Sequence, residues 1–167
     1  IGTGLALAYL DKQLGLTSST LYWKIKLIRV FTGLSLYSKA LAICDPLIAA
    51  SPDNAYLRKI KISILRESGA HKEVIKLAKE SLLLQRIRSR DTDSIRFLYL
   101  SSLYATYQFK EFFQVAPAAA ADSDPNSRFR DLLVECALEL GELSIAEKEI
   151  AQYEKDSLES IFFSAWL

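Results

Sequence analysis

Histidine is nearly absent from this chain, which has His71 alone among its 167 residues. Catalytic triads and common zinc sites need one or several imidazoles as base or ligand, so these classes of active site are disfavoured. His71 falls in a turn between two predicted helices, and we interpret it as an exposed turn residue. We therefore expect no enzyme, no bound metal and no cofactor.

Sulfur-containing residues are also scarce. The two cysteines, Cys44 and Cys136, lie far apart on apolar helical stripes and form no C-x-x-C motif. This pattern indicates buried free thiols in a reducing compartment rather than a disulfide. Methionine does not occur at all, so Ile1 is not a natural start and we expect the chain to be a piece of a longer protein.

Long apolar runs and phosphate-binding glycine motifs are missing. The longest uncharged stretch, residues 97–109, has 13 residues, and a helix needs about 20 to cross a bilayer. Gly2 and Gly4 lack the third glycine and the preceding strand of a dinucleotide-binding loop. Neither asparagine begins a glycosylation acceptor, and no basic flank of a signal peptide is present. We expect no membrane span and a cytoplasmic location, with the nucleus as the alternative.

Charge is unevenly distributed along the chain. Residues 1–90 hold 15 lysines and arginines against 6 acidic residues, a net charge of +9, whereas residues 91–167 hold 6 against 14, a net charge of −8. Such an asymmetry indicates a polarised surface.

Apolar residues recur at intervals of three and four throughout, which predicts amphipathic helices and no strands. Turn-forming residues interrupt this pattern at 51–54, 67–71, 89–94, 122–126 and 140–144. Ser51-Pro52 and Asp124-Pro125 place a capping side chain before a proline, and we predict that helices start at these two points.

The segments after the short turns share one phase. Each has an apolar residue at its fifth position, and these residues are 34, 38 and 34 positions apart: Ala40, Val74, Phe112 and Ala146. We assign the four extra residues of the longer interval to residues 86–93. Counting back 34 positions from Ala40 reaches Ala6, so a partial unit precedes the first complete one.

A helix–turn–helix period of 34 residues is that of tetratricopeptide repeats, and the chain resembles this family over nearly its whole length. Ala40 matches the small residue of the second helix, Phe31 the aromatic position of the first helix, and Pro52 the closing proline. Leu65 and Leu103 occupy the position of Phe31 in later units, and Gly69 and Gly141 the inter-helix turn.

The repeats depart from the family at the helix crossing. The family has a small residue there on the first helix, whereas this chain has larger ones: Ile28, Ile62, Leu100 and Val134. We therefore describe the units as divergent, and Pro46 inside a second helix should kink it.

The resemblance implies an all-α fold, a right-handed α-solenoid of antiparallel helix pairs. We expect one domain over residues 1–167, with four pairs at residues 20–50, 53–87, 91–121 and 125–155, and a flanking helix at each end. Stacked pairs bury a shared core and leave a concave surface.

By the same resemblance, certain first-helix positions line the concave groove. In the basic half these positions combine aromatic, cationic and hydroxyl side chains, and in the third unit they are aromatic or hydroxylic: Tyr22, Lys26, Arg29, Tyr56, Lys59, Ser63, Phe97, Ser101 and Tyr104. Such a groove suits an acidic or phosphorylated segment, or a nucleic-acid backbone. The family's carboxylate clamp is absent, because Ile25, Ile60 and Leu98 stand at clamp positions.

The function predicted from these features is a protein-interaction scaffold or adaptor that binds an acidic or amphipathic peptide or helix of a partner. A secretion or assembly chaperone that shields an apolar segment is the alternative, and RNA binding is favoured less. Carboxylate pairs such as Glu135 and Glu139 are interpreted as a solvated helix face. The oligomeric state is open.

Overall fold

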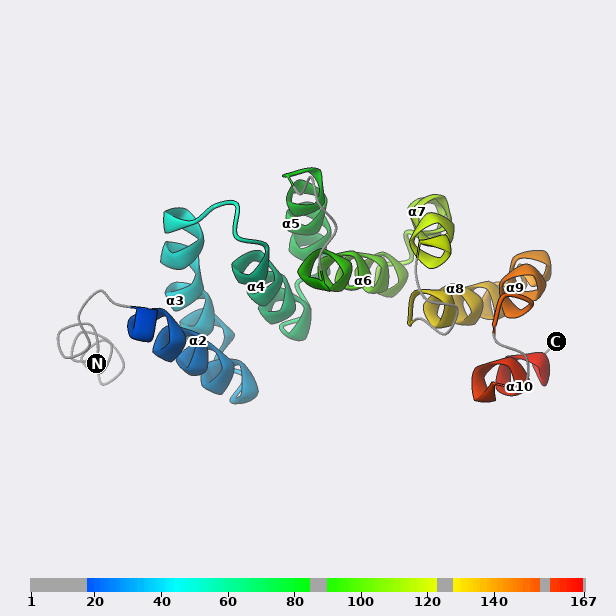
Figure 1. Cartoon of the computed structure of the whole chain (residues 1–167), viewed down its shortest axis with the longest axis horizontal. Coiled ribbons are helices and arrows are strands. Elements are labelled where there is room, and N and C mark those ends of the chain that lie inside the picture. Colours follow the sequence, from blue (N-terminus) through cyan, green and yellow to red (C-terminus); the bar gives the residue numbers. More distant parts are fainter. Residues whose placement is uncertain (1–17, 85–89, 123–127, 154–156, 167) are drawn as a thin grey trace. The chain divides into compact units, whose positions relative to one another are not determined.

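The computed structural model describes residues 18–84, 90–122, 128–153 and 157–166, and every regular element in these ranges is an α-helix (Figure 1). The helices are α2 (Ser18–Gly33), α3 (Tyr37–Ala50), α4 (Ala55–Glu67), α5 (His71–Leu84), α6 (Arg90–Ala105), α7 (Phe109–Ala121), α8 (Arg128–Glu139), α9 (Leu143–Ile150) and α10 (Leu158–Ser164). The all-α prediction is confirmed for these ranges, and the helices begin and end within a few residues of the predicted limits. The pair predicted at residues 53–87 is not confirmed, because α4 and α5 belong to different compact units. The flanking helix expected before residue 18 lies outside the described residues.

The chain divides into two compact units, Ile1–Ala70 and His71–Leu167. In the first unit, α3 packs against both α2 and α4. In the second unit each helix from α5 to α10 packs against the next one, and α8 also packs against α6. Within each unit, packing therefore joins helices that are close in sequence, which is the contact pattern of a repeat array.

The same turn recurs after α2, α4, α6 and α8. Ser35, Gly69, Tyr107 and Gly141 have φ angles of 57°, 78°, 58° and 74°, in the left-handed region that favours glycine. At each turn the N–H of the next residue donates to the carbonyl five positions back, as Leu36 does to Phe31 at 2.8 Å and Glu142 does to Ala137 at 2.8 Å. This is a Schellman motif, which satisfies carbonyl groups at the end of the first helix. The left-handed residues are 34, 38 and 34 positions apart, the spacing found in the sequence.

The residues that define the predicted phase occupy equivalent places. Ala40, Val74, Phe112 and Ala146 are each the fourth residue of α3, α5, α7 and α9, and each is 0% exposed. The large residues predicted at the helix crossing are at most 1% exposed: Ile28, Ile62, Leu100 and Val134. Leu65 and Leu103 are buried, as expected at the aromatic position, but Phe31 is only partly buried.

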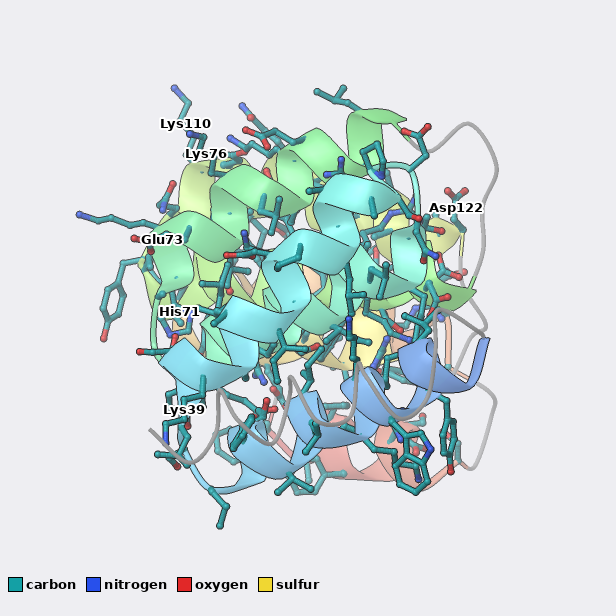
Figure 2. The ribbon with its side chains drawn as sticks, turned by 90° about the vertical axis from the view of Figure 1, so that its left-hand side faces the viewer. Lys39, His71, Glu73, Lys76, Lys110 and Asp122 are labelled. Atoms are coloured by element: carbon teal, nitrogen blue, oxygen red, sulfur yellow. The ribbon has the colours of Figure 1, made fainter. Side chains whose placement is uncertain are left out.

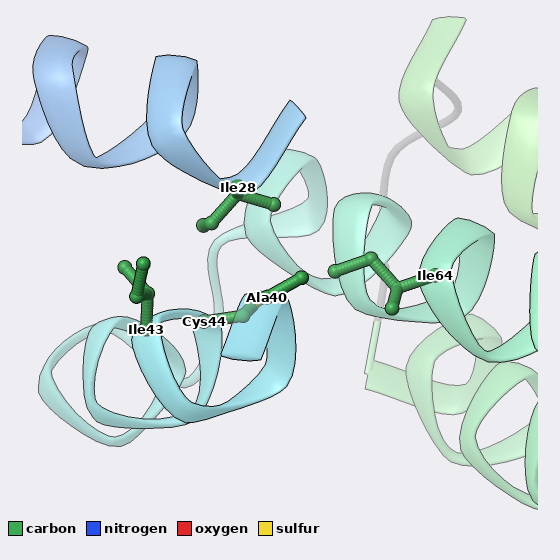
Figure 3. Packing of buried hydrophobic residues seen from close by; sticks show 5 residues of the cluster. All are labelled: Ile28, Ala40, Ile43, Cys44 and Ile64. Atoms are coloured by element: carbon green, nitrogen blue, oxygen red, sulfur yellow. The ribbon is translucent and has the colours of Figure 1, made fainter. Parts of the chain in front are cut away.

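The core of the first unit brings together side chains from three helices. Ile28 of α2 faces Ala40, Ile43 and Cys44 of α3, and Ile64 of α4 closes the cluster (Figure 3). In the second unit, a further cluster joins α8, α9 and α10 through Val134, Ile150, Tyr153 and Phe163.

The outward faces of the second helices are charged. Glu73 and Lys76 of α5 and Lys110 of α7 are exposed and extend away from the ribbon (Figure 2). Both cysteines are buried free thiols, as predicted. Burial raises the pKa of Cys44 to about 11 and that of Cys136 to about 12.

Two predicted boundaries are wrong, and a third lies outside the described ranges. Ser51-Pro52 does not start a helix: α4 begins at Ala55, because the Asn54 side chain accepts the N–H of Leu57 at 3.2 Å and acts as the N-cap. The turn predicted over 89–94 is helical from Arg90 onward. Asp124-Pro125 falls outside the described residues.

Pro46 lies inside α3 as predicted, and α7 also contains a proline, Pro117. Both helices continue past these positions. None of the helices in the described ranges combines the length and the apolar composition that a bilayer span requires.

Candidate partner-binding surfaces

The first six predicted site residues lie on α2 and α4, in the first unit. Tyr22, Lys26 and Arg29 are spaced by four and three residues, so they share one face of α2. Tyr56, Lys59 and Ser63 of α4 are spaced by three and four, with the same result. We call these six residues the α2/α4 surface.

Cations and aromatic rings are paired on this surface. The Lys26 ammonium lies 5.3 Å from the centroid of the Tyr22 ring, and the Lys59 ammonium lies 4.7 Å from that of Tyr56. Between the helices, the Arg29 guanidinium donates a hydrogen bond of 3.1 Å to the Tyr56 hydroxyl. The structure therefore joins residues 27 positions apart in the sequence within the first unit.

A cavity of about 290 Å³ opens between α2 and α4. Ile28, Ile60 and Ile64 provide its apolar wall, while Arg29 and Ser63 provide polar groups. Glu67 also lines this cavity, and the sequence analysis did not identify it as a site residue. Tyr22 does not line this cavity. Its side chain is 54% exposed, and its ring packs edge-on against Trp23 with 5.5 Å between the ring centroids.

Positive charge dominates the first unit. Residues 1–70 hold 9 lysines and arginines against 4 acidic residues, a net charge of +5. One of these cations is neutralised locally, because Lys61 forms an ion pair of 2.8 Å with Asp45. The α2/α4 surface carries three cations of its own, so an anionic segment would meet favourable potential there.

The other predicted site residues, Phe97, Ser101 and Tyr104, lie on α6 in the second unit. Phe97 is partly buried, with the Phe129 ring 5.9 Å away and the Arg128 guanidinium 4.3 Å from its centroid. Burial lowers the pKa of Arg128, and Asp93 opposes that shift. Phe97 thus contributes to the contact between α6 and α8.

Ser101 and Tyr104 also make internal contacts. Ser101 is buried, and its hydroxyl donates to the Leu98 carbonyl at 3.1 Å. The Tyr104 hydroxyl donates to the Glu139 carboxylate, and this hydrogen bond and burial raise the pKa of Tyr104. Both predicted groove residues therefore form hydrogen bonds to other residues of the second unit.

A second cavity, of about 350 Å³, lies between α8 and α10. We call it the C-terminal pocket. Its walls combine apolar, aromatic and acidic side chains: Glu135, Leu138, Glu139, Phe162, Phe163 and Trp166.

Internal contacts hold α10 and the pocket in place. Phe163 is 5% exposed and stacks on Tyr153 with 5.8 Å between ring centroids. Phe162 of α10 and Trp166, which follows that helix, are 57% and 66% exposed. The Tyr153 hydroxyl donates to Asp131 of α8 at 2.8 Å. Burial and this bond raise the pKa of Tyr153.

This pocket was not predicted, although the sequence contains a pattern that points to it. Asp131, Glu135 and Glu139 are spaced by four residues, which puts all three on one side of α8. The repeat spacing that puts Val134 at the position of Ile28 also predicts a further helix after α9, which is α10. The two facts together suggest that aromatic residues of α10 meet these carboxylates.

Within the described ranges, no three or more histidine, cysteine, aspartate or glutamate side chains gather closely enough to hold a metal ion. A comparison of the chain with family models, curated proteins and solved structures found no match.

Proposed function

We propose that this chain is a protein-interaction scaffold, a divergent tetratricopeptide-like array that binds an acidic segment of a partner protein on the α2/α4 surface. The observation that carries the proposal is the bond between Arg29 and Tyr56 beside an open cavity. The recurring turns at Ser35, Gly69, Tyr107 and Gly141 support the repeat assignment.

The chemistry of the surface suits carboxylates. Arg29 presents a planar guanidinium that accommodates a carboxylate with two parallel hydrogen bonds. Lys26 and Lys59, which lie over tyrosine rings, add positive charge to either side. The isoleucines of the cavity wall would accept one apolar side chain of the same segment.

Binding can be measured by fluorescence anisotropy with a labelled peptide that alternates glutamate and leucine. Reversing Lys26, Arg29 and Lys59 to glutamate should abolish binding. The matched control reverses Lys72, Lys76 and Lys110, three exposed lysines of the second unit. Because the Debye length is about 8 Å at physiological ionic strength, raising the salt should weaken the native interaction.

Each possible result has a definite meaning. If both triple reversals weaken peptide binding equally, or if neither weakens it, there is no specific site on α2 and α4. Competition by polyanions of any sequence would favour RNA binding instead. Peptide binding that persists at high salt, and that fails when the cavity wall is changed by Ile60→Ala, would favour an apolar chaperone groove.

A further inference from the structure

The C-terminal pocket has an apolar floor and an exposed aromatic rim. Leu138 and Phe163 line it, and Phe163 is anchored in the core of α8, α9 and α10. At the rim, the Phe162 and Trp166 rings lie 6.3 Å apart and leave most of their surface exposed. Large aromatic side chains of this kind supply much of the binding energy in protein interfaces.

Carboxylates surround this rim. Asp131, Glu135 and Glu139 follow one another along α8, and Glu159 of α10 lies in the adjoining hollow with Phe162. Within the described residues, none of these four carboxylates forms an ion pair. Tyr153 and Tyr104 donate to Asp131 and Glu139. Glu135, between them, has neither a hydrogen bond nor an ion pair in that part of the chain.

The concentration of negative charge acts on Glu135. Burial of its carboxyl group raises its pKa, and the neighbouring Asp131 and Glu139 raise it further. Because like charges repel, ionisation of Glu135 carries a cost even though its side chain is exposed and open to a ligand. A cation placed beside Glu135 would relieve that cost, because an opposite charge favours the ionised carboxylate.

We propose that the C-terminal pocket binds an arginine-bearing, apolar-faced segment of a second partner protein. The guanidinium lies against the exposed ring of Trp166 or Phe162 and pairs with Glu135, while an adjacent apolar side chain enters the pocket over Leu138. Arginine fits better than lysine because its planar group both stacks on aromatic rings and forms two parallel hydrogen bonds with a carboxylate.

This surface is separate from the α2/α4 surface in three respects. It lies in the second unit, it has the opposite charge, and its residues are Glu135, Phe162 and Trp166. A scaffold with both surfaces would hold an acidic segment and a basic segment at the same time. The net charges of +5 for residues 1–70 and −4 for residues 71–167, which hold 12 basic and 16 acidic residues, agree with this assignment.

The test uses the whole chain and two labelled amphipathic peptides with leucines along one face. One peptide has arginines beside the leucines, and the other has citrulline at the same places, which keeps the shape and removes the charge. The arginine peptide should bind more tightly. Glu135→Gln should weaken it by roughly tenfold, the effect of losing one charge-assisted contact, and should leave the citrulline peptide unchanged.

Matched variants separate the pocket from general surface effects. Trp166→Ala should weaken both peptides, whereas Leu143→Ala, at a side chain 50% exposed on α9 outside the pocket, should weaken neither. Glu147→Gln removes an exposed carboxylate of α9 and should also have no effect. Glu135→Gln relieves repulsion on α8, so its melting temperature should not fall, and weaker binding cannot then be attributed to unfolding.

A charge exchange completes the design. Glu135→Arg should bind a peptide with glutamates in place of the arginines, which the unchanged protein rejects. Equal binding of the arginine and citrulline peptides, or no response to Glu135→Gln, overturns the proposal. Concentration-dependent self-association in sedimentation that Trp166→Ala abolishes would overturn it in favour of a second copy of the chain. The triple reversal on α2 and α4 leaves the result unchanged, so this proposal and the proposed function fail independently.

Discussion

At the scale of single residues, the left-handed turn positions differ in how well they suit their backbone. Gly69 and Gly141 adopt positive φ without strain, whereas Ser35 and Tyr107 carry a side chain in the same conformation. A Cβ atom added at Gly69 or Gly141 would meet no atom within 4 Å. The backbone conformation alone therefore decides the effect of a substitution there.

We expect Gly141→Ala to lower the free energy of unfolding by about 1 kcal/mol, the usual penalty for a side chain in the left-handed region. Ser35→Gly should have the opposite sign and a smaller size, because the added freedom of the unfolded chain offsets part of the relieved strain. Urea denaturation followed by circular dichroism measures both. If both variants changed the free energy of unfolding in the same direction and by the same amount, the turn assignment would be wrong.

Glu111 of α7 provides a pH prediction. The Lys79 ammonium lies 2.5 Å from its carboxylate and the Tyr99 hydroxyl donates to the same oxygen. Both bonds lower the pKa of Glu111, the lysine contributing more. The resulting stabilisation is present above the ordinary pKa of 4.5 and disappears as the pH falls through the lowered value.

Carbon-13 NMR titration of the Glu111 carboxyl group should show it ionising below its ordinary pKa of 4.5. Lys79→Met should move the titration of Glu111 back upward, because the lysine is the largest cause of its lowered pKa. A Glu111 curve that does not respond to Lys79→Met would show that the lysine is not its partner in solution.

At the scale of elements, a buried ion pair joins α8 to α9. The Arg130 guanidinium lies 3.4 Å from the Glu149 carboxylate, and the side chains are 6% and 10% exposed. Arg130 also donates to the Ala120 carbonyl at 3.4 Å and lies 5.8 Å from the centroid of the Tyr153 ring. It therefore connects α8 with the end of α7, with α9 and with the residues that follow α9.

Removing one partner should be costly. Glu149→Ala removes the carboxylate that pairs with the buried Arg130, and we expect a loss of about 3 to 5 kcal/mol in the free energy of unfolding. The double variant Arg130→Met, Glu149→Leu should recover most of that loss, since apolar residues of similar volume avoid the desolvation of both charges. Thermal denaturation of the two variants decides this, and a double variant no more stable than Glu149→Ala would contradict it.

The helices were predictable from the sequence because two independent signals agree on them. The apolar phase of Ala40, Val74, Phe112 and Ala146 defines the inward face, and turn residues mark the breaks. Helix starts were less predictable: Ser51 and Asn54 are both good capping residues, and only the local backbone decides that Asn54 caps α4. Phe31 is partly exposed because its burial depends on neighbours that the phase alone does not specify.

The candidate sites were predictable in part. The spacing of Tyr22, Lys26 and Arg29 predicts that they share one face of a helix. The repeat period predicts that Tyr56 lies on the equivalent face of α4, and its hydroxyl accepts a hydrogen bond from Arg29. The same reasoning could not predict that Tyr104 donates to Glu139. The two residues are 35 positions apart, and the bond depends on how the side chains of α6 and α8 are oriented. Glu135 is exposed, as predicted for a solvated helix face. The spacing on α8 could not show that the rings of Phe162 and Trp166 line the same pocket.

At the scale of the whole molecule, each unit has its own core, so damage should remain local. Ile28→Ala in the first unit and Phe112→Ala in the second each remove a fully buried side chain, at a cost of about 2 to 5 kcal/mol. Hydrogen exchange with mass spectrometry should show faster exchange in α2–α4 for the first variant and in α6–α9 for the second. Equal acceleration throughout the chain in both variants would show that the units unfold together.

The chain has two tryptophans, and each lies beside one of the two surfaces. Trp23, 47% exposed, is next to Tyr22 on α2, and Trp166 is at the rim of the C-terminal pocket. The protein therefore carries an intrinsic fluorophore for each surface. With Trp23→Phe, a blue shift in emission reports on the pocket alone, and with Trp166→Phe it reports on α2, so each occupancy can be followed with its own variant and without a label.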